Sequence, residues 1–377
     1  MHEMDHFKSF LTVDRFGSLD GLRALSIAGV LWAHSALWIG MSAPIAAKGF
    51  YGVSLFFAIS GFLICSLMIR ERMKHGTISL RGFYVRRSLR IFPLYYAVLL
   101  VYVAVVSALE QGPAGEEFFR NLPAFLTYTS NWFVENGHTE RVIFYFAWTL
   151  AAEEQFYLTW PWVERYASPR FRTIALGALL ALVLVTQFGL LFWLLPEGSL
   201  RHNIMWGIPP SIVLGVAFAH ITHTRKGFEI ARSIFGHRWS APLLLCLLGI
   251  ILNFTHFPLL AHACCAALVL SCVIREDNGL ARFLKWKPMV RIGIVSYGMY
   301  LMHMLAFNFS AKVGPVAGLE NPWVLWLIGC VLTYVAAEIS FATFERFFLS
   351  LKHTFTNKRA AADATQREPL EVASLER

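Results

Sequence analysis

The stretch DGLRALSIAGVLWAH, from Asp20 to His34, decides how the chain must fold. It belongs to a long apolar run, yet it carries three ionisable side chains, Asp20, Arg23 and His34. The eleven-residue spacing of Arg23 and His34 returns them to nearly the same helix face, about 16 Å apart along the axis. An arginine inside a membrane helix costs about 2.5–3.5 kcal/mol or more, so it usually faces a polar interior. We therefore interpret this helix as part of a functional site. The alternative, in which Arg23 reaches out to the lipid headgroups as an anchor, explains His34 poorly.

The composition indicates an integral membrane protein. The chain has 377 residues, of which 56% are hydrophobic and 15% charged, with a mean hydropathy of +0.53. A soluble domain typically carries about 25% charged residues. The net charge of +9 is typical of a membrane protein with basic cytoplasmic loops, so we expect no nucleic-acid partner. All six cysteines fall in apolar stretches without metal-ligand spacing. We interpret them as packing residues and expect no metal site.

Ten stretches are long and apolar enough to cross a bilayer. They cover approximately residues 19–41, 49–70, 91–110, 148–165, 172–196, 203–223, 240–257, 258–275, 291–310 and 322–346. The segment 122–133 is shorter and more polar, and we expect it to lie at the outer face as an interfacial or re-entrant piece. The predicted fold is all-α, a polytopic membrane bundle of about ten transmembrane helices.

The distribution of basic residues orients this bundle. If the N-terminus is cytoplasmic and every span crosses once, only five of the 33 Lys and Arg lie outside, namely Lys48, Arg120, Arg141, Arg201 and Lys312. This asymmetry follows the positive-inside rule and predicts that both termini are cytoplasmic. We divide the chain into a cytoplasmic N-terminal segment 1–18, a membrane domain 19–350 and a polar cytoplasmic tail 351–377 that we expect to be disordered.

Three arginines mark the inner end of the third span. Arg86, Arg87 and Arg90 lie within about one helical turn at the predicted membrane surface. Arginine binds phosphate oxygens in pairs, so the cluster could hold a phosphorylated cytoplasmic ligand. It could equally bind lipid headgroups or only set the topology. The residues alone leave these alternatives open.

Further polar residues lie inside the predicted spans. Glu153 and Glu154 begin the fourth span, on the side that His34 approaches, and His303 lies in the outer half of the ninth span. A carboxylate beside an imidazole can orient it and raise its basicity. Ser60 and Gly61 sit mid-span, where small residues could serve either close packing or catalysis. Residues that we expect to support substrate binding or structure are Asp20, Ser60, Glu153 and Tyr297.

Together these motifs resemble the acyltransferase 3 family of integral membrane O-acyltransferases. Asp20–Arg23 with His34 is similar to the family's Arg-x10-His arrangement. The other similar elements, in order along the chain, are FFAISGFLI at Phe56–Ile64, RRSLRIFP at Arg86–Pro93, WTLAAEEQFYLTWP at Trp148–Pro161 and SYGMYLMH at Ser296–His303. Thr149 and Ala152 replace the serine and valine usual in the fourth element. The resemblance covers nearly the whole membrane domain.

The resemblance implies a donor and a compartment. The donor would be acyl-CoA, most often acetyl-CoA, taken from the cytoplasm as a substrate, with no permanently bound cofactor. Arg86, Arg87 and Arg90 would be the donor-side arginines, and His34 and Arg23 the essential pair. The acceptor would be a surface polysaccharide, its lipid-linked precursor or a glycoside, and the membrane a bacterial inner membrane. Some relatives carry a fused extracytoplasmic domain, so a separate extracytoplasmic acyl-handling protein could be a partner here.

We therefore expect transfer of an acyl group, acetyl in the usual case, from acyl-CoA to a hydroxyl of a sugar-containing acceptor. A positioned general base accelerates such a transfer by about 10²–10⁴-fold, and we assign that role to His34. Glu154 would orient it, with His303 as a second polar partner and Arg23 holding phosphate. A covalent relay through Ser60 stays open. The main alternative is a transporter or flippase in which the buried charges couple ion movement and no chemistry occurs.

Overall fold

The computed structural model describes residues 6–39, 46–135, 142–190, 198–254 and 257–351, and within them every regular element is a helix. The all-α prediction is therefore confirmed for this part of the chain. The predicted tail falls outside the described residues from residue 352 onward. The helices are α1 (His6–Thr12), α2 (Gly17–Ile39), η1 (Ala46–Phe50), α3 (Tyr51–His75), α4 (Leu80–Leu109), α5 (Pro113–Leu126), α6 (Ser130–Phe133), α7 (Ala147–Tyr166), α8 (Pro169–Gln187), α9 (Leu200–Trp206), α10 (Pro210–Thr222), α11 (Arg225–Phe235), α12 (Ser240–Phe254), α13 (Pro258–Ile274), α14 (Ala281–Leu284), α15 (Lys287–Val316), α16 (Pro322–Ser340) and the π-helical turn η2 (Phe341–Glu345).

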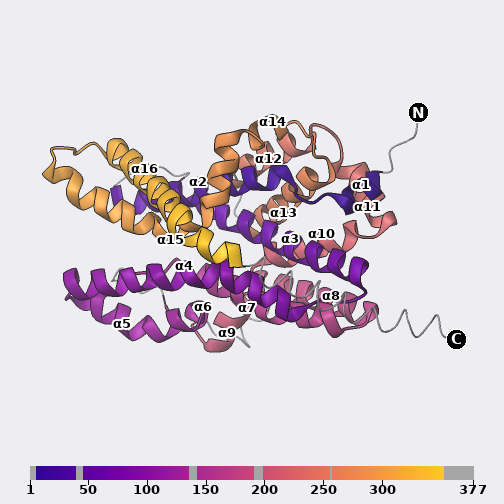
Figure 1. Cartoon of the computed structure of the whole chain (residues 1–377), viewed down its shortest axis with the longest axis horizontal. Coiled ribbons are helices and arrows are strands. Elements are labelled where there is room, and N and C mark those ends of the chain that lie inside the picture. Colours follow the sequence, from indigo (N-terminus) through magenta and orange to yellow (C-terminus); the bar gives the residue numbers. More distant parts are fainter. Residues whose placement is uncertain (1–5, 40–45, 136–141, 191–197, 255–256, 352–377) are drawn as a thin grey trace.

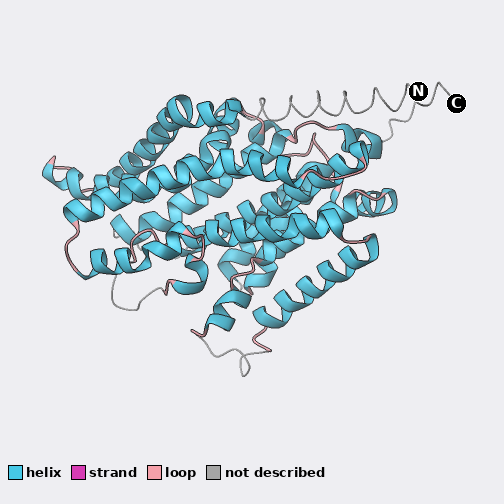
Figure 2. Ribbon diagram, turned by 60° about the horizontal axis from the view of Figure 1, so that its bottom comes forward, coloured by secondary structure: helices cyan, strands magenta, loops and turns pink. Residues whose placement is uncertain are grey.

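The long helices form two rows that run along the longest axis of the molecule (Figure 1). Helices α4 to α9 make up the lower row, and α2, α3, α15 and α16 lie above them. Within the upper row, α3 packs along α10, and α15 packs against both α2 and α16. The second view shows the same helical layers with short connections between them (Figure 2).

The predicted spans coincide with helices, but their number stays a prediction. By length and apolar composition, five helices could cross a membrane, or up to seven if each of two bent helix pairs is one span. The other predicted spans coincide with α2, α7 and α13. The segment 122–133 is not one continuous helix, because α5 ends at Leu126 and α6 covers only Ser130–Phe133. The cytoplasmic placement of the termini likewise stays a prediction.

Helix α4 begins much earlier than the apolar pattern indicated. The predicted span starts at residue 91, whereas α4 begins at Leu80, where the Ser79 hydroxyl accepts a hydrogen bond from the Gly82 amide at 3.1 Å. The left-handed Gly76 (φ +70°) ends α3 just before it. Arginine is a good helix former, so a basic stretch ends the hydrophobic run without ending the helix. The arginine cluster therefore lies inside α4 and not at its start.

Glycine allows α3 and α10 to approach closely. A Cβ atom on Gly61 would lie 2.1 Å from the Ile212 carbonyl oxygen, so no larger residue fits there. This confirms the packing interpretation for Gly61, while its neighbour Ser60 points to a cavity described below. The chain also bends just before Pro210, where α9 and α10 meet at an angle of 42°.

Candidate active site

A cavity of about 290 Å³ lies between the two rows of helices. Its walls come from α2, α3 and α15 on one side and from α4 and α7 on the other. Eight of the residues singled out from the sequence line it, namely Arg23, Ser60, Arg86, Arg87, Arg90, Glu153, Glu154 and Tyr297. Residues from five helices that are far apart in the sequence thus meet at one place.

The arginines of the cavity differ in their partners. Arg86 pairs with Glu71 at 3.3 Å. Arg87 lies over the ring of Tyr157, 4.2 Å from its centroid. Arg90 lines the cavity with an exposed side chain. Among the described residues, no carboxylate lies within ion-pair distance of Arg87 or Arg90. Two guanidinium groups without acidic partners are suited to bind an anion.

Asp20 and Tyr297 both form hydrogen bonds that hold residues of the cavity wall in place. Asp20 is buried, and its two carboxylate oxygens accept hydrogen bonds from Arg23 at 3.0 Å and Arg15 at 2.6 Å. This pairing fixes the direction in which Arg23 leaves α2. The Tyr297 hydroxyl donates to the Ile91 carbonyl oxygen at 2.9 Å, which ties α15 to α4 beside the cavity. Asp20 therefore positions Arg23, and Tyr297 joins two of the helices that line the cavity.

The serine on α3 belongs to a small hydrogen-bonded group. The hydroxyls of Ser60 and Tyr157 both donate to the carboxylate of Glu153, and the two hydroxyl oxygens are 2.6 Å apart. Sequence analysis did not single out Tyr157, although it follows Glu153 by four residues, so that the two share one face of α7. Glu153 is thereby partnered, while Glu154 lines the cavity near the arginines.

His34 and His303 are not among the residues that line the cavity, but their rings lie side by side. Their ring centroids are 4.8 Å apart at an interplanar angle of 64°. Nδ1 of His34 contacts the Val30 carbonyl oxygen at 3.0 Å, and Nδ1 of His303 contacts the Tyr300 carbonyl oxygen. Because a carbonyl oxygen only accepts, each Nδ1 carries a proton, and each neutral ring keeps a free electron pair on Nε2. His303 is fully buried, and among the described residues its Nε2 has no hydrogen-bond partner.

We predicted that Glu154 would orient His34. The Val30 carbonyl oxygen holds Nδ1 of His34, so a carboxylate could orient this ring only through Nε2, and the role of Glu154 stays a prediction. The spacing of four residues along α2 makes this bond local to the helix. The predicted association of His34 with His303, in contrast, is present. Glu154 instead faces the cavity of the arginines.

Tyr300 separates the cavity from the histidine pair. It lines the cavity, and its ring centroid is 5.6 Å from that of His303. Its hydroxyl hydrogen-bonds to the Thr149 hydroxyl at 2.6 Å and to the Phe146 carbonyl oxygen at 3.0 Å. These bonds hold the ring between α15 and α7. Sequence reasoning quoted Tyr300 within a motif but gave it no role, because nothing in the pattern shows which tyrosine stands next to a histidine.

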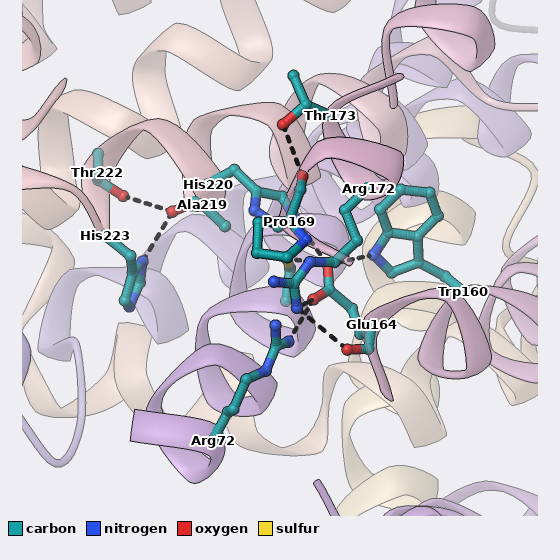
Figure 3. A network of polar contacts seen from close by, with 11 residues as sticks. Arg72, Trp160, Glu164, Pro169, Arg172, Thr173, Ala219, His220, Thr222 and His223 are labelled. Carbon is teal, nitrogen blue, oxygen red and sulfur yellow. Dashed lines mark hydrogen bonds and ion pairs between the residues drawn. The ribbon is translucent and has the colours of Figure 1, made fainter. Parts of the chain in front are cut away.

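A second group of charges lies outside the cavity, around Glu164 of α7 (Figure 3). Its carboxylate is fully buried and lies 2.6 Å from Arg72, 3.6 Å from Arg172 and 2.6 Å from Nε2 of His220. The indole nitrogen of Trp160 donates to it at 3.2 Å. We call these residues, with Cys65, the Glu164 cluster. It joins α3, α7, α8 and α10, and the sequence analysis did not identify it.

The Glu164 cluster contains a possible ligand set for a metal ion. One ligand atom each from Cys65, Glu164 and His220 lies within 4.8 Å of the others. However, the same carboxylate already accepts hydrogen bonds from Arg72 and from the Trp160 indole, and it forms an ion pair with Arg172. A cation placed there would be repelled by both guanidinium groups. The residues present therefore fit an ion-pair network better than a metal site.

Comparison with known proteins places the chain in a family. The model of an acyltransferase domain family matches residues 16–339. The chain belongs to this family. Together with its long apolar helices, this supports an integral membrane protein. No solved structure gives a significant match to it.

Two curated relatives of this chain are named as O-acetyltransferases. The chain is 28% identical over 353 residues to the O-acetyltransferase OatA of Staphylococcus aureus. This match covers 87% of the chain and 56% of that protein. The chain is 25% identical over 363 residues to the peptidoglycan O-acetyltransferase OatA of Listeria monocytogenes, with coverage of 87% and 55%. The chain thus spans about half the length of the curated relatives it matches.

Proposed function

We propose that this chain is a membrane O-acyltransferase that moves an acyl group, acetyl as in its relatives' names, from acyl-CoA to a hydroxyl of a sugar-containing acceptor. One observation carries the proposal. A cavity with two arginines free of acidic partners ends at Tyr300, and Tyr300 packs against a histidine whose Nε2 is unoccupied among the described residues. An anion-binding region and a base lie on two sides of one aromatic ring.

The arginine side of the cavity suits the donor. Coenzyme A carries several phosphate groups, and guanidinium groups bind phosphate oxygens through paired, charge-assisted hydrogen bonds. Arg87 and Arg90 are the candidates because no carboxylate of the described residues lies within ion-pair distance of them. Arg23, fixed by Asp20, adds a third positive group on the opposite wall. The rest of the donor would extend through the cavity toward Tyr300.

The histidine side suits the transfer step. Nε2 of His34 or His303 would take the proton of the acceptor hydroxyl as the oxygen bonds to the thioester carbonyl carbon. The carbon–sulfur bond then breaks, and the CoA thiolate takes up a proton, so that free CoA and an ester result. We assign the base to His34, which is partly exposed, and a supporting role to the buried His303. Ser60 donates a hydrogen bond to Glu153, a carboxylate that could take its proton, so a covalent relay through Ser60 stays open.

We place the protein in the cytoplasmic membrane of a bacterium, with the arginine cluster toward the cytoplasm where acyl-CoA is found. The acceptor would be a glycan on or destined for the cell surface, in line with the peptidoglycan named for one relative. A separate, extracytoplasmic acyl-handling protein could complete the transfer to that glycan.

The test measures the donor and the product together. Membranes containing the wild-type chain, supplied with labelled acetyl-CoA and a cell-wall glycan fraction, should release CoA and yield ester-linked label. Substitution His34→Ala should lower both by about 10²–10⁴-fold. His75→Ala, which removes an exposed histidine at the end of α3, is the matched control and should leave both unchanged. A His34→Ala protein as active as wild type would overturn the mechanism. Accumulation of a solute in sealed vesicles without acyl-CoA would instead favour a transporter.

A further inference from the structure

A second cavity, wider and more apolar, lies on the other side of the histidine pair. Its volume is about 680 Å³, and its walls come from α4, α15 and α16. Most of the lining is hydrocarbon, including Val101, Val105, Met302, Leu305 and Leu332, and the polar residues Glu110, Asn308 and Lys312 complete it. We call it the apolar groove. Nothing in the acyl-transfer chemistry derived above uses it.

A row of three aromatic rings separates the apolar groove from the arginine-lined cavity. Tyr300 lines the cavity, and Tyr102 lines the groove. Phe146 lies between them, with ring centroids 5.6 Å from Tyr300 and 6.2 Å from Tyr102. Phe146 also packs against His303 at 5.1 Å. It is buried, so its ring fills the space directly beside the histidine pair.

The position of the Phe146 ring determines how much space an acyl group finds beside His303. If the thioester carbonyl is attacked near the histidine pair, as the proposed function requires, the acyl chain beyond the carbonyl extends away from the CoA. Tyr300 and Phe146 both flank His303. A two-carbon acyl group is short enough to end before it reaches the Phe146 ring. Each further methylene group would have to displace this packed ring. Protein interiors are packed too densely to yield such space without cost.

We propose that Phe146 limits the length of the acyl group that this chain transfers, and that the apolar groove receives the tail of a longer acyl group once the Phe146 ring is removed. This inference rests on the proposed function, because it needs a thioester beside the histidine pair. The apolar lining of the groove indicates what it would bind. A hydrocarbon tail matches the apolar walls, and the groove extends along α15 from Met302, next to His303, to Val313, about 16 Å along the helix axis.

The experiment compares acetyl-CoA with hexanoyl-CoA as donors for membranes containing the full chain. The wild type should use acetyl-CoA with strong preference. Substitutions Phe146→Leu and Phe146→Ala should raise the ratio of hexanoyl to acetyl transfer, by an order of magnitude or more for alanine, since hydrophobic pockets discriminate by about 10–200-fold per methylene. The leucine variant retains an apolar side chain and tests the proposal if the alanine variant fails to fold.

Two further variants make the result specific. Phe118→Ala removes a buried ring of α5 whose ring contacts, among the described residues, are with Phe119 and Phe125 and not with Phe146 or His303, and it should leave the donor ratio as in wild type. Adding Ala336→Phe to Phe146→Ala refills the groove from α16 and should abolish the gain with hexanoyl-CoA while acetyl transfer persists.

The outcomes separate the two proposals. If the wild type uses no acyl-CoA at all, the proposed function fails. If the wild type transfers acetyl but both Phe146 variants keep its donor ratio, the inference about Phe146 is wrong and the function stands. Equal use of both donors by the wild type would also overturn the inference, because the ring would then impose no limit.

Discussion

Two groups of arginines face acidic residues of the same helix, α7, and they are arranged in opposite ways. In the Glu164 cluster, one buried carboxylate is held by Arg72, Arg172 and His220, so every charge has a partner (Figure 3). In the cavity, Arg87 and Arg90 have no carboxylate within ion-pair distance among the described residues. The residue types are alike, but the pairing differs. Paired buried charges hold helices together, whereas unpaired cations beside a cavity are available to a ligand.

The largest effect should follow from breaking the paired group. Substitution Glu164→Ala leaves two guanidinium groups and a histidine without their shared acceptor, and breaking a buried ion pair costs about 3–5 kcal/mol. We expect a large fall in thermal stability, or in the yield of folded protein after detergent extraction. Glu229→Ala, which removes an exposed pair with Arg225 on α11, is the control and should change neither. A Glu164→Ala protein that melts like wild type would show that the paired charges around Glu164 do not stabilise the fold.

The unpaired group should respond in the opposite way. Arg90→Ala removes no ion pair seen among the described residues, so thermal stability should change little. It should raise KM for acyl-CoA by about ten- to hundredfold, because a hydrogen bond to a charged group contributes about 1.5–3 kcal/mol. Arg81→Ala, an exposed arginine earlier in α4, should leave KM unchanged. If Arg90→Ala destabilised the fold without affecting KM, Arg90 would belong with the structural charges.

An exposed pair provides the smallest expected effect. In the loop after α13, Arg275 donates to both carboxylate oxygens of Asp277, at 3.0 and 3.1 Å, which lowers the pKa of Asp277 below its ordinary value. A carboxylate with a lowered pKa stabilises the fold above the pKa of the unfolded chain, and this contribution is lost as the pH falls. Wild type should therefore melt slightly above Asp277→Asn at neutral pH, and the difference should vanish in acid. A constant difference across this pH range would contradict the assignment.

The sequence predicted the features that depend on composition and local spacing. The helical fold follows from apolar runs, and the meeting of His34 with His303 follows from placing each histidine in the same half of its span. The arginine cluster was identified because its three members share one turn of one helix. The start of α4 was missed because hydropathy marks where a helix becomes apolar, while the Ser79 cap marks where it begins.

The remaining features depend on distances between helices that no single-chain pattern encodes. Glu164 looked like an ordinary residue at the end of a span, and its four partners come from α3, α7, α8 and α10. Glu154 was expected beside His34 because both were placed near the same end of the bundle. The structure shows that a carbonyl oxygen one turn earlier in α2 already occupies Nδ1. Short-range hydrogen bonds of this kind compete with any distant partner.

The two histidines take their orientation from their own helices, through carbonyl oxygens of Val30 and Tyr300. Both helices belong to the upper row, whereas Arg87 and Arg90 belong to α4 in the lower row (Figure 1). The base and two of the three donor-binding arginines are therefore carried by different rows of helices, while Arg23 shares α2 with His34. The distance between the histidines and these two arginines therefore depends on the spacing of the two rows. Any change in lipid or sequence that alters this spacing would tune the reaction rate without touching a single residue of the site.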